Sequence, residues 1–218
     1  SRPLATISNV DMAKAMLWPW SSPPSLISLR GRNVHLRLPQ LADYEQWQAL
    51  RRSSREFLLP FEPRWTEADL ARRVFVTRVK RAREEAQAGS DYALFIFLGE
   101  TGNETLVGGI TLSNVRRRAA QFVNLGYWMG QTYAGKGLMT EAVGACLPFV
   151  FDTLDLHRIH AAFLPGNTAS RRVLEKNGFV EEGFAEKYLQ INGRWEDHVL
   201  FGLNRERYEL ACFTRRAL

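Results

Sequence analysis

The sequence contains few of the residues that build metal centres or disulfide frameworks. Its 218 residues include two cysteines and four histidines, and these are scattered without the spacing of a metal site or a disulfide pattern. No run of about 18 apolar residues occurs, so a membrane-spanning helix is not expected. We therefore predict a protein with no metal and no membrane partner, in a reducing, cytoplasmic compartment.

Internal repeats and low-complexity segments are also absent, and the remaining composition is that of a globular protein. Hydrophobic residues make up 45% and charged residues 24%, and the length suits one domain. The proline-containing segment 1–28 is interpreted as an N-terminal arm, and residues 29–218 as a single domain. The sequence leaves the oligomeric state open between a monomer and a dimer.

The chain is basic, with a formal net charge of +6. Such a charge suits nucleic-acid binding, and it equally suits a cofactor that carries several phosphate charges. We find no RNA-binding signature of the aromatic-sheet or KH type. The run Arg116-Arg117-Arg118 is interpreted as a solvated turn between two strands. Contact with a ribosome or with cofactor phosphates is the alternative.

A strand, a glycine loop and a helix follow one another in the centre of the chain. Residues 122–129 are rich in aromatic and β-branched side chains, which favours a strand. The loop spans 130–137, and the helix after it contains Pro148, which predicts a kink because proline cannot bond the carbonyl of Gly144. Apolar residues recur at helical spacing along one stripe, namely Leu138, Met139, Ala142, Val143, Cys146, Leu147, Val150 and Phe151.

This loop has features of a phosphate-binding site. Gly135 and Gly137 lack Cβ, so a ligand can approach the backbone closely. The first N–H groups of the helix have no internal partner, and Lys136 adds a positive charge. An ordinary glycine-rich turn is the alternative. A nucleoside-triphosphate P-loop is disfavoured, because Gly137 stands where Ser or Thr should hold Mg²⁺.

The remaining elements alternate in a way that predicts an α/β (α+β) fold with a mixed, twisted sheet flanked by helices. Strands are expected over 29–38, 92–98, 105–112, 119–129, 158–164, 180–191 and 194–203. Helices are expected over 41–52, 66–88, from 136, over 168–176 and over 205–213. The segment Phe57–Trp65 is expected to be a proline-bounded loop.

Several separated motifs together resemble one family. One matching piece is the loop Gly135–Met139, which is followed by Glu141. A second is Asn167 with Ser170. The other matching segments are 57–63, 113–115, 173–179, 191–193 and 195–199. In this order they resemble the RimJ/RimL-type branch of the GCN5-related N-acetyltransferase (GNAT) family, the ribosomal-protein alanine N-acetyltransferases. The resemblance covers about residues 29–208. Ala134 and Met139 depart from the general coenzyme A loop of the family.

The resemblance implies the GNAT fold, a strongly twisted sheet in which two neighbouring strands splay to admit coenzyme A. It implies acetyl-CoA as cosubstrate. The implied cofactor-binding residues are Trp128, Met129, Gln131, Gly135, Lys136, Gly137, Leu138, Met139, Asn167 and Ser170. Backbone N–H groups at Trp128 and Met129 would stabilise the oxyanion, although strand packing is the alternative for both residues. Asn167 also suits a helix N-cap.

The implied reaction needs a neutral amine and a proton for the leaving thiolate. An α-amine has a pKa of about 7.7–8.0 and a lysine of about 10.4, so an α-amine needs only a weak base. Glu62, in the segment 57–63, is our first candidate for that contact, and Glu141, one turn into the helix after the phosphate loop, is the second. Leu189 stands where RimL-like proteins carry a glutamate. Ser170 is placed near the thiolate by the resemblance, and Tyr188 is the alternative proton donor.

The implied function is acetyl transfer to a primary amine, most simply the N-terminal alanine or serine of a ribosomal protein, with possible ribosome contact. Two alternatives stay open. The acceptor could be a small amine such as a polyamine or an aminoglycoside. The chain could also be a ribosome-associated binding module that kept the fold without the activity.

Overall fold

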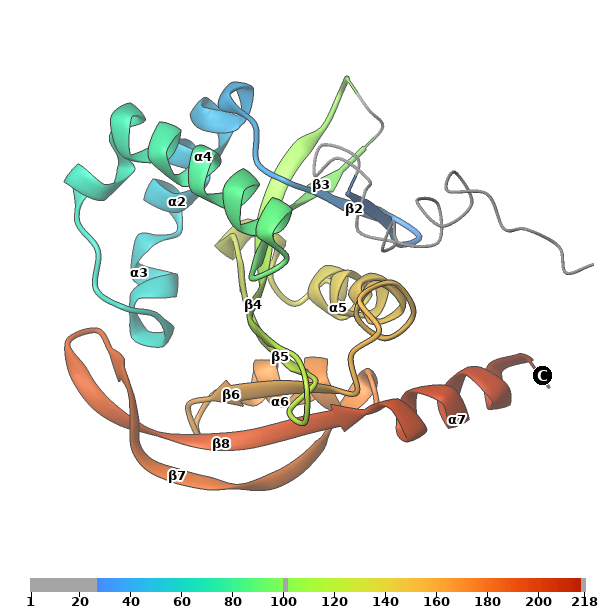
Figure 1. Cartoon of the computed structure of the whole chain (residues 1–218). Helices are drawn as coiled ribbons and strands as arrows, with labels where there is room; N and C mark the ends of the chain where they lie inside the picture. The colour runs from blue at the N-terminus through green and yellow to red at the C-terminus, as the bar shows by residue number, and fades with distance from the viewer. Residues whose placement is uncertain (1–26, 100–101, 217–218) are drawn as a thin grey trace, which may run out of the picture.

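The computed structural model describes residues 27–99 and 102–216, so the expected N-terminal arm lies outside the described residues except for 27 and 28. The strands form one eight-stranded sheet in the order β1-β2-β3-β4-β5-β6-β8-β7 (Figure 1). Only β5 and β6 are parallel, and the other neighbours are antiparallel. The strands are β1 (Ser28–Arg30), β2 (Val34–Arg37), β3 (Tyr92–Leu98), β4 (Thr105–Arg116), β5 (Phe122–Met129), β6 (Arg158–Phe163), β7 (Val180–Ile191) and β8 (Arg194–Asn204).

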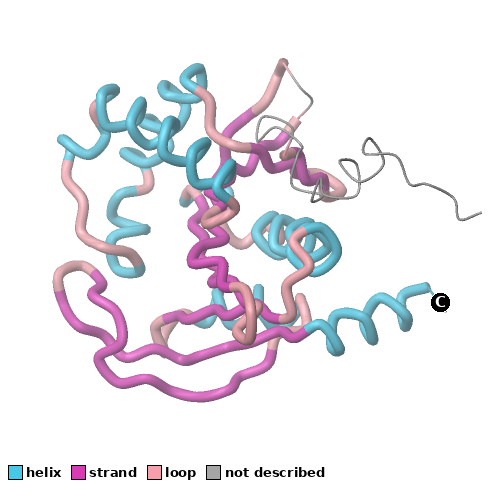
Figure 2. Tube along the Cα trace, viewed as in Figure 1, coloured by secondary structure: helices cyan, strands magenta, loops and turns pink. Residues whose placement is uncertain are grey.

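Helices cover both faces of this sheet, which confirms the predicted fold class (Figures 1 and 2). The α-helices are α2 (Tyr44–Ser53), α3 (Arg55–Leu58), α4 (Arg72–Ala88), α5 (Leu138–Pro148), α6 (Thr168–Lys176) and α7 (Arg205–Arg216). Short turns are η2 (Leu41–Asp43), η3 (Leu59–Phe61), η4 (Glu67–Leu70), η5 (Gln131–Tyr133) and the π-helical η6 (Phe149–Thr153). Helix α4 packs on β3 and α2 on β4, whereas α5 contacts β1, β2 and α6. In the part of the chain that the structure describes, no helix has the length and hydrophobicity that spanning a bilayer requires.

Each face of the sheet has its own core. Phe75 of α4 and Trp47 of α2 pack with their rings 4.9 Å apart, and both belong to an aromatic cluster that includes Phe95 of β3. On the other face, the α5 stripe is buried as its spacing predicted, except that Leu138 is only partly buried. Burial of one large apolar side chain contributes about 1.5–3 kcal/mol. The two cores therefore hold the central strands in place from both sides.

Two local predictions concern prolines. The α-helix α5 ends at Pro148, where we predicted a kink, and continues as the π-helical turn η6, in which the hydrogen bonds span five residues. The expected loop 57–65 contains the end of α3 and the turn η3. Pro60 is tolerated in the first turn of η3, because an N–H group there would have no helical acceptor.

The arginine run 116–118 ends β4 and enters the turn before β5. All three residues are exposed, in agreement with a solvated turn. Arg117 nevertheless donates a hydrogen bond from Nη1 to the carbonyl oxygen of Leu154, 2.5 Å away. This arginine therefore ties the turn to the segment that follows η6.

The parallel strands β5 and β6 separate before they end. Their pairing runs from Phe122 with Arg158 to Leu125 with Ala161 and then stops. Residues 126–129 still pair with β4, and the end of β6 still pairs with β8. The backbone groups of 126–129 that point away from β4 consequently have no strand partner, which is the splay that the resemblance predicted.

The β4–β5 ladder depends on Gly108, because a Cβ there would lie 2.5 Å from the carbonyl oxygen of Trp128 and 3.2 Å from Cα of Met129. Both atoms are backbone and cannot turn away. We expect Gly108→Ala to lower the free energy of unfolding by about 2 kcal/mol in urea denaturation. Gly126→Ala on the neighbouring strand is the control, because its Cβ would meet nothing within 4 Å. Equal effects of the two substitutions would contradict the steric argument.

Candidate active site

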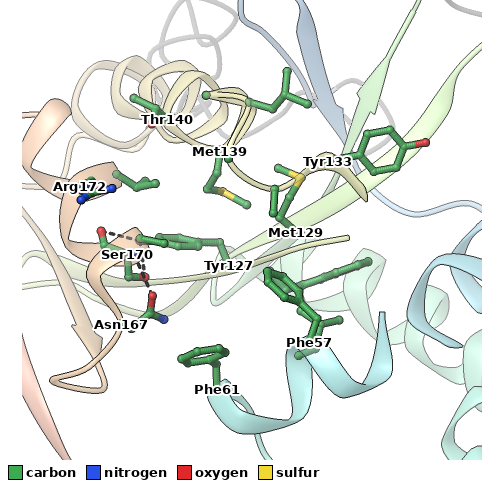
Figure 3. A pocket seen from close by; sticks show the side chains of 18 of the residues that line it. Phe57, Phe61, Tyr127, Met129, Tyr133, Met139, Thr140, Asn167, Ser170 and Arg172 are labelled. Carbon is green, nitrogen blue, oxygen red and sulfur yellow. Dashed lines mark hydrogen bonds between the residues drawn. The ribbon is translucent and has the colours of Figure 1, made fainter. Parts of the chain in front are cut away.

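A cavity of about 410 Å³ lies at the splayed end of β5 (Figure 3). Its walls come from β5, the loop before α5, helix α6 and the α3–η3 segment. The lining residues are Phe57, Leu58, Phe61, Glu62, Tyr127, Trp128, Met129, Tyr133, Ala134, Gly135, Gly137, Leu138, Met139, Thr140, Asn167, Ala169, Ser170, Arg172, Val173 and Lys176. We call it the coenzyme cavity below.

The glycine loop presents free backbone amides to this cavity. Gly135 and Gly137 have φ angles of +75° and +81°, which glycine adopts without strain. Gly137 is the N-cap of α5, and no side chain caps this helix end. The first N–H groups of α5, at residues 138–140, have no acceptor within the helix. The helix dipole adds partial positive charge there, so the loop can bind an anionic group.

Eight of the ten sequence-predicted cofactor-binding residues line the coenzyme cavity, namely Trp128, Met129, Gly135, Gly137, Leu138, Met139, Asn167 and Ser170. Gln131 and Lys136 do not. The backbone N–H of Gln131 donates to Ser54 Oγ at 3.0 Å, and Lys136 Nζ lies 5.7 Å from the centre of the Tyr133 ring. The cavity instead takes cations from Arg172 and Lys176, one turn apart on α6, which sequence reasoning missed.

Ser170 lines the cavity and forms a hydrogen-bonded group with Tyr127 and Asn167 (Figure 3). The hydroxyl groups of Ser170 and Tyr127 are 2.9 Å apart, and either can donate. The Ser170 backbone N–H donates to Asn167 Oδ1 at 3.0 Å, so Asn167 is the predicted N-cap of α6 and also lines the cavity. Burial raises the pKa of Tyr127 to about 12, although the hydrogen bond with Ser170 acts in the opposite direction. Tyr127 therefore stays protonated at neutral pH and can act as a donor.

Glu62 lines the cavity, but its carboxylate is already bound. Arg51 donates to both carboxylate oxygens, at 2.6 and 3.0 Å, and Trp65 Nε1 donates to Oε1. The Arg51 guanidinium lies between two rings, 4.7 Å from the centre of Trp65 and 4.9 Å from that of Trp128. This arrangement holds Glu62 in one place and pairs its negative charge with a guanidinium, which weakens the carboxylate as a base.

The other two predicted catalytic residues lie outside the cavity lining. Glu141 points from α5 to the turn between β1 and β2, where Asn33 and Val34 donate backbone N–H groups to its carboxylate. Burial acts to raise the pKa of Glu141, but these hydrogen bonds outweigh it and lower the pKa. Tyr188 is 47% exposed on β7, with its ring 5.8 Å from that of His198. Glu141 therefore has a structural contact, and Tyr188 faces largely to solvent.

A second cavity of about 260 Å³ adjoins the first between the splayed strands. We call it the acceptor cavity. Both cavities are lined by Phe61, Glu62, Tyr127, Asn167 and Ser170. The rest of its lining is largely apolar, namely Pro63, Leu125, Gly126, Ala161, Ala162, Phe163, Leu164, Leu174, Leu189, Ile191 and His198. The Ser170–Tyr127 pair therefore lies where the two cavities meet. No group of histidine, cysteine, aspartate and glutamate among the described residues could hold a metal ion.

Comparisons with known proteins agree with this geometry. A profile of the acetyltransferase (GNAT) domain matches residues 33–180. The probable N-acetyltransferase YjcK of Bacillus subtilis is 33% identical over 175 residues, covering 80% of this chain and 96% of the relative. The ribosomal protein uS5-alanine N-acetyltransferase of Escherichia coli is 36% identical over 164 residues, which cover 75% of this chain and 80% of the relative. The structure of Mycobacterium smegmatis RimJ in complex with CoA-disulfide matches with a TM-score of 0.75 at 31% identity. The match covers 87% of this chain and 94% of that structure's chain.

Proposed function

Because the chain belongs to the acetyltransferase (GNAT) family and is an acetyl-CoA-dependent N-acetyltransferase, we propose that its acceptor is the α-amine of a protein N-terminus. The simplest such acceptor is the N-terminal alanine or serine of a ribosomal protein, in keeping with the named activity of the Escherichia coli relative. We further propose that residues 29–218 work as one catalytic domain, since one sheet includes β1 through β8.

The acceptor cavity carries this proposal. Its only carboxylate among the described residues is that of Glu62, and Arg51 already binds both oxygens. A polyamine or an aminoglycoside brings several positive charges, and each would need an anionic partner or water inside the cavity. An N-terminus brings one ammonium group and a small side chain, which suits an apolar chamber.

A neighbouring cleft of about 580 Å³ supports the same choice. It lies between the α3–η3 segment and the tip of the β7–β8 hairpin, and it shares Ile191 with the acceptor cavity. Arg55, Arg64 and Arg194 line it, with Glu196 as the one acidic residue among the described lining. Three guanidinium groups repel a polycation and favour an extended peptide with acidic side chains.

The residues present fit acetyl-CoA, which when bound supplies an acetyl thioester for attack by the amine. The amides of residues 138–140 would hold its pyrophosphate, with Arg172 and Lys176 nearby as cations. The backbone groups of Met129 point away from β4, so they would hold the pantetheine arm and stabilise the oxyanion. Trp128 was predicted to share this role, but its backbone groups face Gly109 of β4. Ser170 would donate a hydrogen bond to the departing thiolate, and Tyr127, whose hydroxyl lies 2.9 Å from that of Ser170, would hold the Ser170 hydroxyl in place.

The proposal predicts selectivity for peptides over small amines. We expect the protein to acetylate Ala- and Ser-starting peptides with kcat/KM at least about 100-fold above that for spermidine, because a second buried ammonium without a partner costs several kcal/mol. Both kcat/KM values are measured from the release of free coenzyme A, which a thiol reagent detects. Preferred acetylation of the polyamine would refute the peptide assignment, and turnover of no amine would favour the non-catalytic binding module.

The cellular setting is also part of the proposal. A ribosomal-protein acceptor places the reaction in the cytoplasm and requires contact with a ribosomal protein or the ribosome. The exposed arginine turn at residues 116–118 offers one basic surface for such contact.

A further inference from the structure

One imidazole in the acceptor cavity has a fixed tautomer. His198 lies on β8, is only 2% exposed, and contributes to the cavity lining. Its Nδ1 is 2.9 Å from the backbone carbonyl oxygen of Glu196. A carbonyl oxygen can only accept, so Nδ1 carries the hydrogen. In the neutral ring, the lone pair is therefore on Nε2.

The lone pair of Nε2 is available to a molecule in the cavity. No described residue forms a hydrogen bond with Nε2. Among the described residues, every side-chain nitrogen or oxygen that is fully buried has a hydrogen-bond partner, so Nε2 is not fully buried. Nε2 therefore keeps access to solvent space. Because the rest of the His198 side chain is covered, the space open to it is the acceptor cavity that it lines.

The other titratable groups around His198 either form hydrogen bonds within the protein or stay protonated. Glu62 lines the same cavity but is bound by Arg51 through both oxygens, and Tyr127 is held protonated. From β7, the Tyr188 ring packs edge-on against His198. The Asp197 carboxylate accepts the Lys187 backbone N–H, 2.9 Å away. Among the described lining residues, His198 is thus the one nitrogen base whose lone pair accepts no hydrogen bond, whereas the Glu62 carboxylate is neutralised by the Arg51 guanidinium.

We propose that His198 is the general base that prepares the acceptor amine, an inference that rests on the proposed function. The ammonium group loses one proton to Nε2, and the neutral nitrogen then attacks the thioester carbonyl carbon. The C–S bond breaks, and the second nitrogen proton passes to the thiolate through the Ser170 hydroxyl. The imidazolium releases its proton to solvent, so the reaction yields the amide, free coenzyme A and one proton.

The substitution His198→Asn tests this role with little change in packing. The asparagine amide can keep the hydrogen bond to Glu196 but has no basic atom. With the best peptide substrate at about pH 6.5, we expect kcat/KM to fall about 100-fold. At about pH 9.5 the α-amine is already neutral in solution, so the deficit should shrink to about 5-fold or less. The Kd for acetyl-CoA and the melting temperature should stay unchanged.

The control is His160→Asn, which changes a histidine on β6 outside both cavities and should stay within about 2-fold at either pH. A His198→Asn deficit of the same size at both pH values would overturn the proposal, and so would full activity at the lower pH. If His198→Asn no longer binds acetyl-CoA, His198→Gln replaces it in the test. The same criterion then applies, namely that the loss of kcat/KM is larger at about pH 6.5 than at about pH 9.5. Failure of the wild-type protein to acetylate any amine would instead refute the proposed function, and this inference with it.

Discussion

Replacing Gly137 with aspartate is expected to weaken acetyl-CoA binding by about 100-fold, whereas asparagine at the same position should weaken it by about 10-fold at most. Gly137 is the N-cap of α5, and its φ angle is +81°. A Cβ there would meet nothing within 4 Å. Aspartate and asparagine are the residues that tolerate this left-handed conformation best, and both suit a helix N-cap.

The two variants therefore differ mainly in one negative charge beside the proposed pyrophosphate site. At an effective dielectric constant of about 20, one like-charge pair about 6 Å apart costs about 3 kcal/mol, which corresponds to about 100-fold in Kd. Calorimetric titration with acetyl-CoA measures the difference directly. The difference in Kd between the two variants should decrease in high salt, because screening weakens exposed charge interactions.

Gly193→Asp is the matched control for charge and backbone strain. Gly193 has the same φ of +81° in the β7–β8 turn, and a Cβ there also meets nothing within 4 Å. It lies on the arginine-lined cleft and outside the coenzyme cavity, so its substitution should leave the Kd for acetyl-CoA unchanged. If aspartate and asparagine at Gly137 weaken binding equally, the amides at the start of α5 do not hold the phosphates.

The elements that local sequence determines could be predicted well. The Asn192-Gly193 turn has φ angles of 45° and 81°, as a two-residue hairpin requires. The capping box between Thr66 and Asp69 is present, although a 3-10 turn precedes α4 where one continuous helix was expected. Gly89 ends α4 in the left-handed conformation. Each of these features depends on residues a few positions apart, so the sequence contains the signal.

The contents of the site depend on contacts between distant segments, and these could not be read from spacing. Glu141 follows the phosphate loop by one turn, but the rotation of α5 directs its carboxylate to a turn more than 100 residues earlier in the chain. Tyr127 reaches Ser170 only because β5 and α6 lie side by side in the fold. His198 lies within the matching piece 195–199, but its place in the acceptor cavity depends on the packing of distant segments around it.

Replacing Arg51 with alanine is expected to lower the free energy of unfolding by about 3 kcal/mol. The side chains of Arg51 and Glu62 are only 11% and 19% exposed, and they form a bidentate ion pair. Without Arg51, the Glu62 carboxylate keeps a single donor, Trp65, in a largely desolvated place. Loss of the guanidinium also removes its stacking between two tryptophan rings.

Arg52→Ala provides the control on the neighbouring residue. Arg52 pairs with Glu67 at 3.0 Å, but the two side chains are 53% and 59% exposed, so solvent screens the pair and its loss should not change stability measurably. Urea denaturation of both variants gives the comparison. Adding Glu62→Gln to Arg51→Ala should recover part of the lost stability, because it removes the uncompensated charge.

The same substitution should affect acceptor binding more than coenzyme binding. The Glu62 backbone carbonyl accepts a hydrogen bond from Asn192 N–H at 3.0 Å, so the segment carrying Glu62 also holds the tip of the β7–β8 hairpin. Glu62 lines both cavities, but Ile191 at the hairpin tip lines the acceptor cavity and not the coenzyme cavity, and the amides at the start of α5 lie on a separate element. We therefore expect Arg51→Ala to raise KM for the peptide at least about 10-fold while the Kd for acetyl-CoA changes less than about 3-fold. Equal changes in the two constants would show that Arg51 supports the whole site and not its acceptor side.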